Sequence, residues 1–215
     1  MKVGTDAVLL GSWVNISEAK RILDVGTGSG VIALMLAQRT TDTIQIDAIE
    51  IEENDAEQAK MNVLNSPWPS KIFVFNTSLQ NFAPTLKYDL IVSNPPYFIN
   101  SLLPPSSHRQ RTRHTEQLTF EELITHSIRL LNPTGTLAII LPFQEGNSFK
   151  QLASKHELHL KRQLAFFSRK EKPQERWLFE FGLGSVETKE EKLILYDTGD
   201  IKSDNYINLT KDFYL

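Results

Sequence analysis

The sequence predicts an α/β protein with an open, doubly wound sheet of mostly parallel strands. Short apolar runs typical of buried strands alternate with stretches of helical periodicity through the first two thirds of the chain. A glycine-rich turn, Asp24-Val-Gly-Thr-Gly-Ser-Gly30, joins the first such run to a helix, and the apolar run Leu90-Ile-Val92 leads into Asn94-Pro-Pro-Tyr97. Because open α/β sheets bind ligands at the carboxyl ends of their strands, these two loops are the expected site.

The expected elements follow the chain in a regular order. Periodicity predicts helices over residues 5–15, 31–39, 54–65, 120–131 and 145–156. It predicts strands over residues 21–25, 44–50, 71–76, 87–93, 136–141, 158–167 and 176–183. The last two strands are expected to pair antiparallel at one edge of a seven-stranded sheet, within a single domain of residues 1–215. The polar tail from Val186 onward receives no element.

Local signals set three of the expected boundaries. Asn54 is the predicted N-cap of the helix at 54–65. Thr119-Phe-Glu-Glu122 has the form of a capping box at the start of a helix. Pro133-Thr-Gly135 is expected to turn the chain into the strand at 136–141.

Composition excludes several classes of protein. The chain has 215 residues, 40% of them hydrophobic and 23% charged, which is typical of a globular domain. With no cysteine, a disulfide framework, a zinc–thiolate site and cysteine catalysis are excluded. No apolar run approaches the roughly 18 residues of a membrane span, and the start lacks the pattern of a signal peptide. The five histidines lack metal-ligand spacing. We therefore expect a cytoplasmic monomer with no metal and no membrane association.

Charge is unevenly distributed along the chain. The net charge is −3, yet residues 109–176 hold 12 Lys and Arg against 7 Asp and Glu, a local balance of +5. Such a chain can present a basic face to phosphate while it remains acidic as a whole. The run from His108 to His114 is the first candidate for phosphate binding, and Arg169-Lys-Glu-Lys172 with Arg176 is the second.

The glycine spacing distinguishes between cofactors. Gly26, Gly28 and Gly30 form G-x-G-x-G rather than the G-x-G-x-x-G of nicotinamide-binding proteins. The carboxylate of Asp24 beside this turn would repel a pyrophosphate and would favour the cationic amino group of S-adenosylmethionine. Glu50, at the end of the second strand, can accept hydrogen bonds from ribose hydroxyls.

The second loop predicts the chemistry of the acceptor. Two prolines make Asn94-Pro-Pro-Tyr97 rigid. The side-chain oxygen of Asn94 and the carbonyl of Pro95 can each accept a hydrogen bond from a planar amino group, which would localise the nitrogen lone pair for methyl transfer. Tyr97 can stack on the ring that carries the amino group, and Phe98 can shape the same pocket. Catalysis of this kind is mainly positioning and electrostatic preorganisation.

These motifs resemble a known group of enzymes. Asp24–Gly30 with Asn94–Tyr97 resembles the class I, Rossmann-like methyltransferases that use S-adenosylmethionine to modify amino nitrogens. Together with Met1–Trp13, Arg113-His114 and Leu209–Leu215, they are similar to the bacterial tRNA1(Val) (adenine(37)-N6)-methyltransferase family over nearly the whole chain. The resemblance implies methylation of the exocyclic N6 of an adenine in tRNA. Members of this family usually carry a further aromatic and basic segment before the position of Met1.

The resemblance also assigns residues to the site. It places Lys2, Thr5 and Asp6 near the amino-acid end of the cofactor. Ser78 stands where the family has an acidic residue for the adenine of the cofactor. The full expected cofactor set is Asp24, Gly26, Gly28, Gly30, Glu50, Ile51, Ser78, Leu79, Lys2, Thr5 and Asp6. The expected catalytic set is Asn94, Pro95 and Tyr97. The expected RNA-binding set is Pro96, Phe98, Arg109, Arg111, Arg113 and His114.

Three other activities compete with this interpretation. A protein glutamine-N5 methyltransferase uses the same Asn-Pro-Pro-Tyr logic, because a side-chain amide is also a planar, conjugated nitrogen. A DNA adenine methyltransferase would need a separate target-recognition domain, for which 215 residues leave no room. A non-catalytic RNA-binding module is disfavoured by the intact glycine turn and Asn94–Tyr97.

Overall fold

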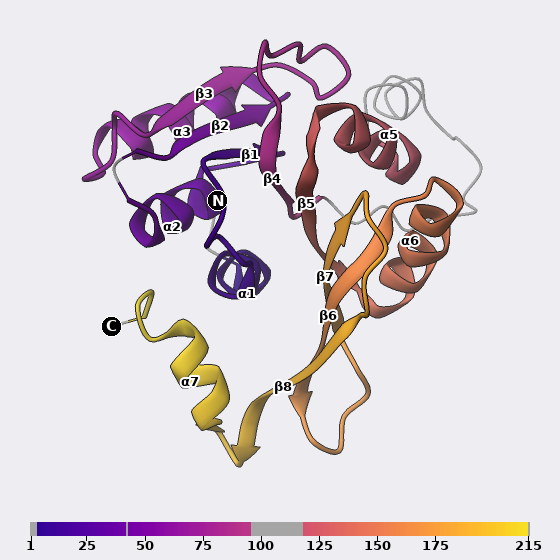
Figure 1. The fold of residues 1–215 in the computed structure, drawn as a ribbon. Helices are drawn as coiled ribbons and strands as arrows, with labels where there is room; N and C mark the ends of the chain where they lie inside the picture. The colour runs from indigo at the N-terminus through magenta and orange to yellow at the C-terminus, as the bar shows by residue number, and fades with distance from the viewer. Residues whose placement is uncertain (1–3, 42, 96–117, 215) are drawn as a thin grey trace, which may run out of the picture.

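The computed structural model describes residues 4–41, 43–95 and 118–214, which form alternating strands and helices (Figure 1). In chain order the elements are α1 (Thr5–Trp13), β1 (Arg21–Val25), α2 (Val31–Arg39), β2 (Gln45–Glu50), α3 (Glu53–Leu64), β3 (Ile72–Asn76), β4 (Tyr88–Ser93), α5 (Phe120–Leu130), β5 (Leu131–Pro142), α6 (Phe143–Lys155), β6 (His159–Arg169), β7 (Arg176–Gly182), β8 (Lys189–Thr198), β9 (Ile201–Lys202) and α7 (Asp204–Thr210).

One sheet organises the fold, with strand order β3-β2-β1-β4-β5-β7-β6-β8-β9. The first five strands pair in parallel, β7 runs antiparallel to both β5 and β6, and β8 runs parallel to β6. The predicted fold class is therefore confirmed. The sheet nevertheless has nine strands rather than seven, and β6 and β7 are interior strands rather than its edge.

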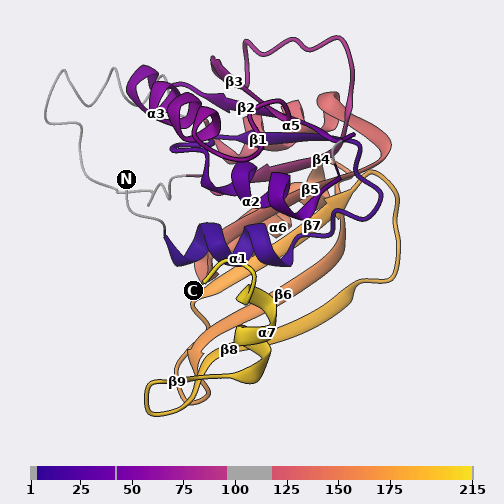
Figure 2. The same cartoon turned by 90° about the vertical axis from the view of Figure 1, so that its left-hand side faces the viewer.

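Helices cover both faces of the sheet. One apolar cluster joins strand residues such as Ile22 and Ile46 to Leu9 of α1 and Leu36 of α2. The other joins Leu23, Ile91 and Leu137 on the opposite face to side chains of α5 and α6. Strands buried on both faces need nearly continuous apolar runs, so the strands at 21–25 and 88–93 are easily recognised in the sequence. Figure 2 shows α1 lying along the sheet, with α7 and β8 below it.

The sequence did not predict β8, β9 or α7, and β8 is the longest of the three. Its charged residues, from Lys189 to Lys192, hide the alternation of a half-buried strand. Leu193 and Leu195 pack into the cluster beneath α1, together with Tyr206 of α7. A strand with one solvent-exposed face is stabilised by pairing with a neighbouring strand and by packing of its other face. For β8, the paired strand is β6.

The local boundaries confirm one predicted signal and correct two. The capping box is present, because Thr119 accepts a hydrogen bond from the Glu122 amide and Glu122 binds back to the Thr119 amide. The N-cap of α3 is Glu52 rather than Asn54, and its side chain makes no capping hydrogen bond. Pro133 and Gly135 lie within β5 rather than before it, where the register with β4 shifts.

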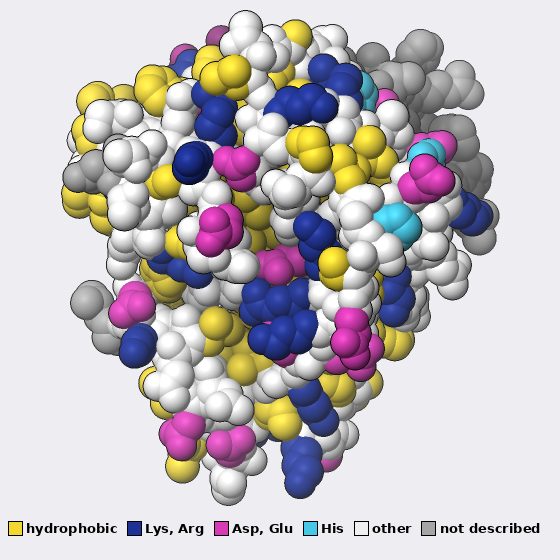
Figure 3. Space-filling model, viewed as in Figure 1, with side chains coloured by type: hydrophobic (Ala, Val, Ile, Leu, Met, Phe, Trp, Pro, Cys, Tyr) yellow, Lys and Arg dark blue, Asp and Glu magenta, His cyan; other side chains and the backbone are white. Residues whose placement is uncertain are grey.

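Charged side chains gather on one face of the molecule. In Figure 3, Lys and Arg side chains lie near the centre of the view, over the region of α1 and β6, with Asp and Glu side chains beside them. The guanidinium of Arg162 lies 4.1 Å from the centroid of the Trp13 ring and binds Glu180 and Glu191. Trp13 donates its indole N–H to Glu191. This network joins α1 to β6, β7 and β8.

None of the helices in the described ranges is long and apolar enough to cross a membrane.

Candidate active site

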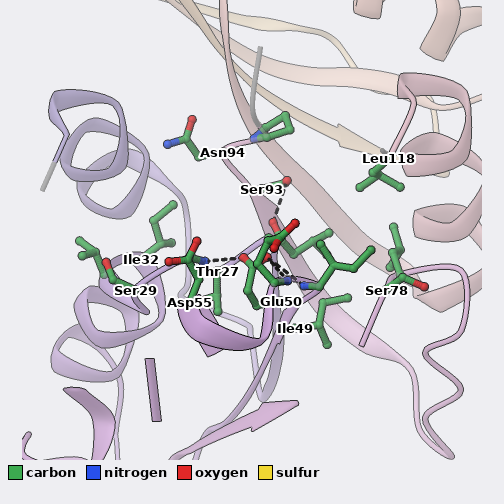
Figure 4. A pocket seen from close by; sticks show the side chains of 18 of the residues that line it. Thr27, Ser29, Ile32, Ile49, Glu50, Asp55, Ser78, Ser93, Asn94 and Leu118 are labelled. Atoms are coloured by element: carbon green, nitrogen blue, oxygen red, sulfur yellow. Dashed lines mark hydrogen bonds between the residues drawn. The ribbon is translucent and has the colours of Figure 1, made fainter. Parts of the chain in front are cut away.

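A cavity of about 560 Å³ opens at the carboxyl ends of β1, β2 and β4. Its size lies within the range of small-molecule binding sites. Its walls come from the glycine turn, the ends of β2 and β3, the loop after β4 and Leu118 near the start of α5 (Figure 4). The two loops singled out in the sequence thus line one cavity, as expected. In Figure 4, Asn94 and Ser93 lie on one side of it and Ser78 on another, with Glu50 between them.

The glycine turn has the backbone conformation that glycine favours. Gly26, Gly28 and Gly30 have φ angles of 69°, 55° and 84°. The amides of Gly26 and Thr27 both donate to the carbonyl of Ile49, so the turn is fixed to the end of β2. Gly30 is the N-cap of α2, and a Cβ there would lie 3.4 Å from Ala59 of α3. The first two glycines line the cavity, whereas Gly30 does not, and its left-handed φ is what favours glycine there.

Asp24 lies beneath the turn and is fully buried. Its Oδ2 accepts hydrogen bonds from the Thr27 hydroxyl at 2.6 Å and from the Ala33 amide at 3.2 Å. Its Oδ1 has no hydrogen-bond partner among the described residues. Burial without a cation raises the pKa of Asp24 to about 7, although the two hydrogen bonds oppose this rise. Asp24 is not a cavity-lining residue, and it reaches the cavity wall through Thr27.

Glu50 is held by backbone amides. Its Oε2 accepts from the Gly28 amide at 2.8 Å, and its Oε1 accepts from the amides of Ile51 and Glu52. These bonds fix the carboxylate in the cavity wall, and each oxygen of a carboxylate can accept more than one hydrogen bond. The arrangement leaves Glu50 able to accept from the hydroxyls of a ligand.

The end of β3 completes this side of the cavity. Asn76 donates its side-chain amide to the carbonyls of Glu50 and Ile51, which ties β3 to β2. Ile51, Ser78 and Leu79 all line the cavity. The Ser78 hydroxyl accepts a hydrogen bond from the Asn81 amide at 3.3 Å.

The acceptor side of the site begins at the end of β4. Ser93 is fully buried and donates its hydroxyl to the Val25 carbonyl, which locks the ends of β4 and β1 together. Asn94 and Pro95 follow directly and line the cavity. The predicted residues Pro96, Tyr97, Phe98, Arg109, Arg111, Arg113 and His114 lie outside the described residues, as does Lys2.

The N-terminal residues that line the cavity are not the ones that were predicted to bind the cofactor. Gly4 and Ala7 line the cavity, whereas Thr5 and Asp6 do not. The Asp6 carboxylate instead accepts a hydrogen bond from the Arg176 guanidinium at 3.1 Å, an ion pair between α1 and β7.

Several lining residues were not predicted from the sequence. Thr27, Asp55 and Leu118 belong to the cavity wall. The glycine motif contains Thr27, so its spacing could have identified that residue. Asp55 and Leu118 carry no local signal, because only the tertiary arrangement brings α3 and the segment before α5 to the cavity.

The donor set fits S-adenosylmethionine. The positive-φ glycines leave space above the turn, since a Cβ on Gly26 would have no heavy atom within 4 Å. Glu50 offers carboxylate oxygens to hydroxyls, and Ile51 and Leu79 offer apolar contact to an adenine ring. The described residues contain no cluster of three or more His, Asp or Glu suited to a metal ion.

Comparison with known proteins identifies the family. The model of the methyltransferase small domain matches residues 2–161. A tRNA1(Val) (adenine(37)-N6)-methyltransferase of Bacteroides fragilis is 44% identical over 218 residues, covering 100% of this chain and 91% of that protein. One of Tolumonas auensis is 43% identical over 216 residues, covering 100% and 90%. The chain belongs to the tRNA1(Val) (adenine(37)-N6)-methyltransferase family.

Solved structures agree on the fold of this methyltransferase. A predicted O-methyltransferase from Agrobacterium tumefaciens superposes with a TM-score of 0.75 at 21% identity, covering 96% of each chain. Identity this low supports the class I methyltransferase fold alone. Membership of the family implies S-adenosylmethionine as the co-substrate.

Proposed function

We propose that this protein transfers a methyl group from S-adenosylmethionine to the exocyclic N6 of adenine 37 in tRNA1(Val). The observation that carries the proposal is the meeting of Asn94-Pro95 with the glycine turn around one cavity. Full-length relatives with 43–44% identity bear that activity in their names. Neither the hypothesis of a protein glutamine-N5 methyltransferase nor that of a non-catalytic RNA-binding module has comparable support.

The donor half of the cavity, formed by the glycine turn and the ends of β2 and β3, would hold the co-substrate. Glu50 would accept from its ribose hydroxyls, while Ile51, Ser78 and Leu79 would contact its adenine. The backbone of Gly26 and Gly28 permits close approach, and Asp24 fixes Thr27 beneath it. When bound, S-adenosylmethionine supplies an electrophilic methyl group.

The acceptor half must overcome the poor nucleophilicity of an exocyclic amine. Its lone pair is conjugated into the base, and hydrogen bonds from its two N–H groups to two fixed acceptors favour a localised lone pair. The side-chain oxygen of Asn94 and the carbonyl of Pro95 are such acceptors, and the buried Ser93–Val25 bond holds their strand in place. Tyr97 would stack on the base. Fixed acceptors contribute because they need no reorganisation during the reaction.

RNA binding would rest on the basic run that follows this loop. Arg109, Arg111, Arg113 and His114 can neutralise or bond backbone phosphates. The target base must leave its stack to reach the cavity, which costs least in a single-stranded loop.

The test is methylation of competing substrates with labelled S-adenosylmethionine. We expect label in an unmodified transcript of tRNA1(Val), recovered as N6-methyladenosine after digestion to nucleosides. A transcript with guanosine at position 37 is the matched control and should stay unlabelled. Label in a release-factor protein or duplex DNA, with none in tRNA, would refute the proposal in favour of glutamine-N5 or DNA methylation.

A further inference from the structure

The C-terminal strands carry a surface that the proposed function has not used. Lys150 of α6 has its ammonium group 5.4 Å from the centroid of the Trp177 ring, and that of Lys192 in β8 lies 4.6 Å from the Phe167 ring of β6. We call Lys150, Phe167, Trp177 and Lys192 the cation–ring face. Lys150, Phe167 and Trp177 are half-buried, and Lys192 is exposed.

Strand registers place these side chains on one face of adjacent strands. Trp177 pairs with Ala165, which in turn pairs with Lys192. Leu164 and Phe166 point into the core beneath α1, so Ala165 and Phe167 point to the opposite face. The rings and ammonium groups therefore form a continuous surface across β7, β6 and β8 beside α6. Figure 2 shows β6 and β8 running out from the main body of the sheet toward β9.

The same registers place this surface at the edge of the sheet that holds the active site. Ile139 pairs with Ser93, which precedes Asn94, and β5 ends three residues later at Pro142. Pro142 pairs with Arg176, and Arg176 pairs with Phe166. Since β6 is three strands from β4, the Phe167 end of β6 lies roughly 15 Å across the sheet from Asn94.

The second basic motif of the sequence, Arg169-Lys-Glu-Lys172, lies beside this surface, but its cations already have partners or acidic neighbours. Arg169 binds Asp200 and the Gly199 carbonyl and lies over the Tyr196 ring, so it holds the β8–β9 turn. Lys170 and Lys172 are exposed in the β6–β7 turn, where Glu171 and Glu175 balance their charge. Lys150 and Lys192 form no ion pair with a described residue, and each lies beside an aromatic ring instead.

An ammonium group beside a half-exposed ring suits a sugar–phosphate backbone. The ammonium neutralises a phosphate, and the ring offers apolar contact to a ribose or a base. A tRNA is much longer than the distance between the cavity and this face, so a tRNA whose adenine enters the cavity can reach both. We propose that the cation–ring face binds the backbone of that tRNA outside the target loop. This inference rests on the proposed function, whose substrate it describes in more detail.

The test measures tRNA binding by the full-length protein. We expect the double variant Lys150→Glu/Lys192→Glu to weaken binding of the tRNA1(Val) transcript about tenfold and to lower the slope of log affinity against log salt by roughly two. The affinity for S-adenosylmethionine and the rate at saturating tRNA should stay within about twofold of the original protein. The matched control is Lys60→Glu/Lys155→Glu, which makes the same charge change at two exposed lysines on α3 and at the end of α6.

The outcomes separate this inference from the proposed function. Equal salt slopes for the double variant, its control and the original protein would overturn the docking surface, even if tRNA is methylated. Binding of tRNA with the expected slopes but no methyl transfer would support the surface and refute the proposed activity. A thermal melt of each variant identifies loss of folding, and in that case Lys150→Gln/Lys192→Gln repeats the test with a smaller charge change.

Discussion

Two groups of charged side chains in the central sheet are held in opposite ways. Away from the cavity, acids and bases pair with one another: Arg162 binds Glu180 and Glu191, and Arg21 binds Asp47. At the cavity, Asp24 and Glu50 are held by neutral amides and a hydroxyl, with no cation among their described partners. Paired charges stabilise the fold, whereas carboxylates held by neutral donors keep accepting capacity for a ligand.

The difference has an energetic consequence. A carboxylate that is buried without a cation is costly, and Asp24 responds with a pKa raised to about 7. Away from the cavity, Asp89 accepts from two backbone amides and from Asn132, and these hydrogen bonds together outweigh its desolvation and lower its pKa. Function and stability thus rest on different groups of charged side chains, and variants in the two groups should separate them in experiments.

The largest effect is expected at the active-site edge. Asn94→Ala should lower the rate of methyl transfer by about 10² to 10³, because it removes a preorganised acceptor. The melting temperature and the affinity for S-adenosylmethionine should change little, since Asn94 lies at the rim of the cavity. Turnover comparable with that of the original protein, measured by transfer of labelled methyl, would remove Asn94 from the catalytic set.

The Arg162 network should give the reverse pattern. Arg162→Met leaves Glu180 buried without its cation and should cost about 3 kcal/mol of unfolding free energy, measured by urea denaturation. The rate per folded molecule should not change. A large loss of rate in fully folded protein would contradict the separation between the two groups of charged side chains.

Asp24 should show the cost of an unpaired carboxylate. Between about pH 4 and pH 7 the folded protein keeps a proton on Asp24 that the unfolded chain has released, so this contribution to stability is lost as the pH rises through that window. Asp24→Asn should therefore stabilise the free protein by about 2 kcal/mol at pH 8 and by much less at pH 4.5. Equal effects in urea denaturation at the two pH values would show that Asp24 does not titrate in this range.

The smallest effect is expected where the cavity meets α5. Thr119→Ala removes the capping box next to the cavity-lining Leu118 and should cost about 1 kcal/mol in urea denaturation. Thr119→Ser keeps the hydroxyl acceptor and serves as the control. If the serine variant lost as much stability as the alanine variant, the effect would come from packing of the Thr119 methyl group rather than from capping.

Sequence patterns were most informative where local chemistry decides the structure. The strands at 21–25 and 88–93, the helix at 31–39 and the Thr119 capping box all follow from short-range periodicity or capping. The glycine turn and Asn94-Pro95 were predicted as halves of one site because the ends of parallel strands meet at one edge. The prediction of β8 failed because its charged residues mask the alternation.

The sequence by itself determined the parallel sheet, the meeting of the two loops, the glycine turn suited to S-adenosylmethionine and the family resemblance. Only the tertiary structure decided that Asp24 lies beneath the cavity wall, that Asp6 pairs with Arg176, and that β8 extends the sheet beyond β6. It also brought Lys150, Phe167, Trp177 and Lys192 to one surface. The physical reason is that burial, ion pairing and strand neighbours depend on segments far apart in the chain, whereas periodicity and turn chemistry are local.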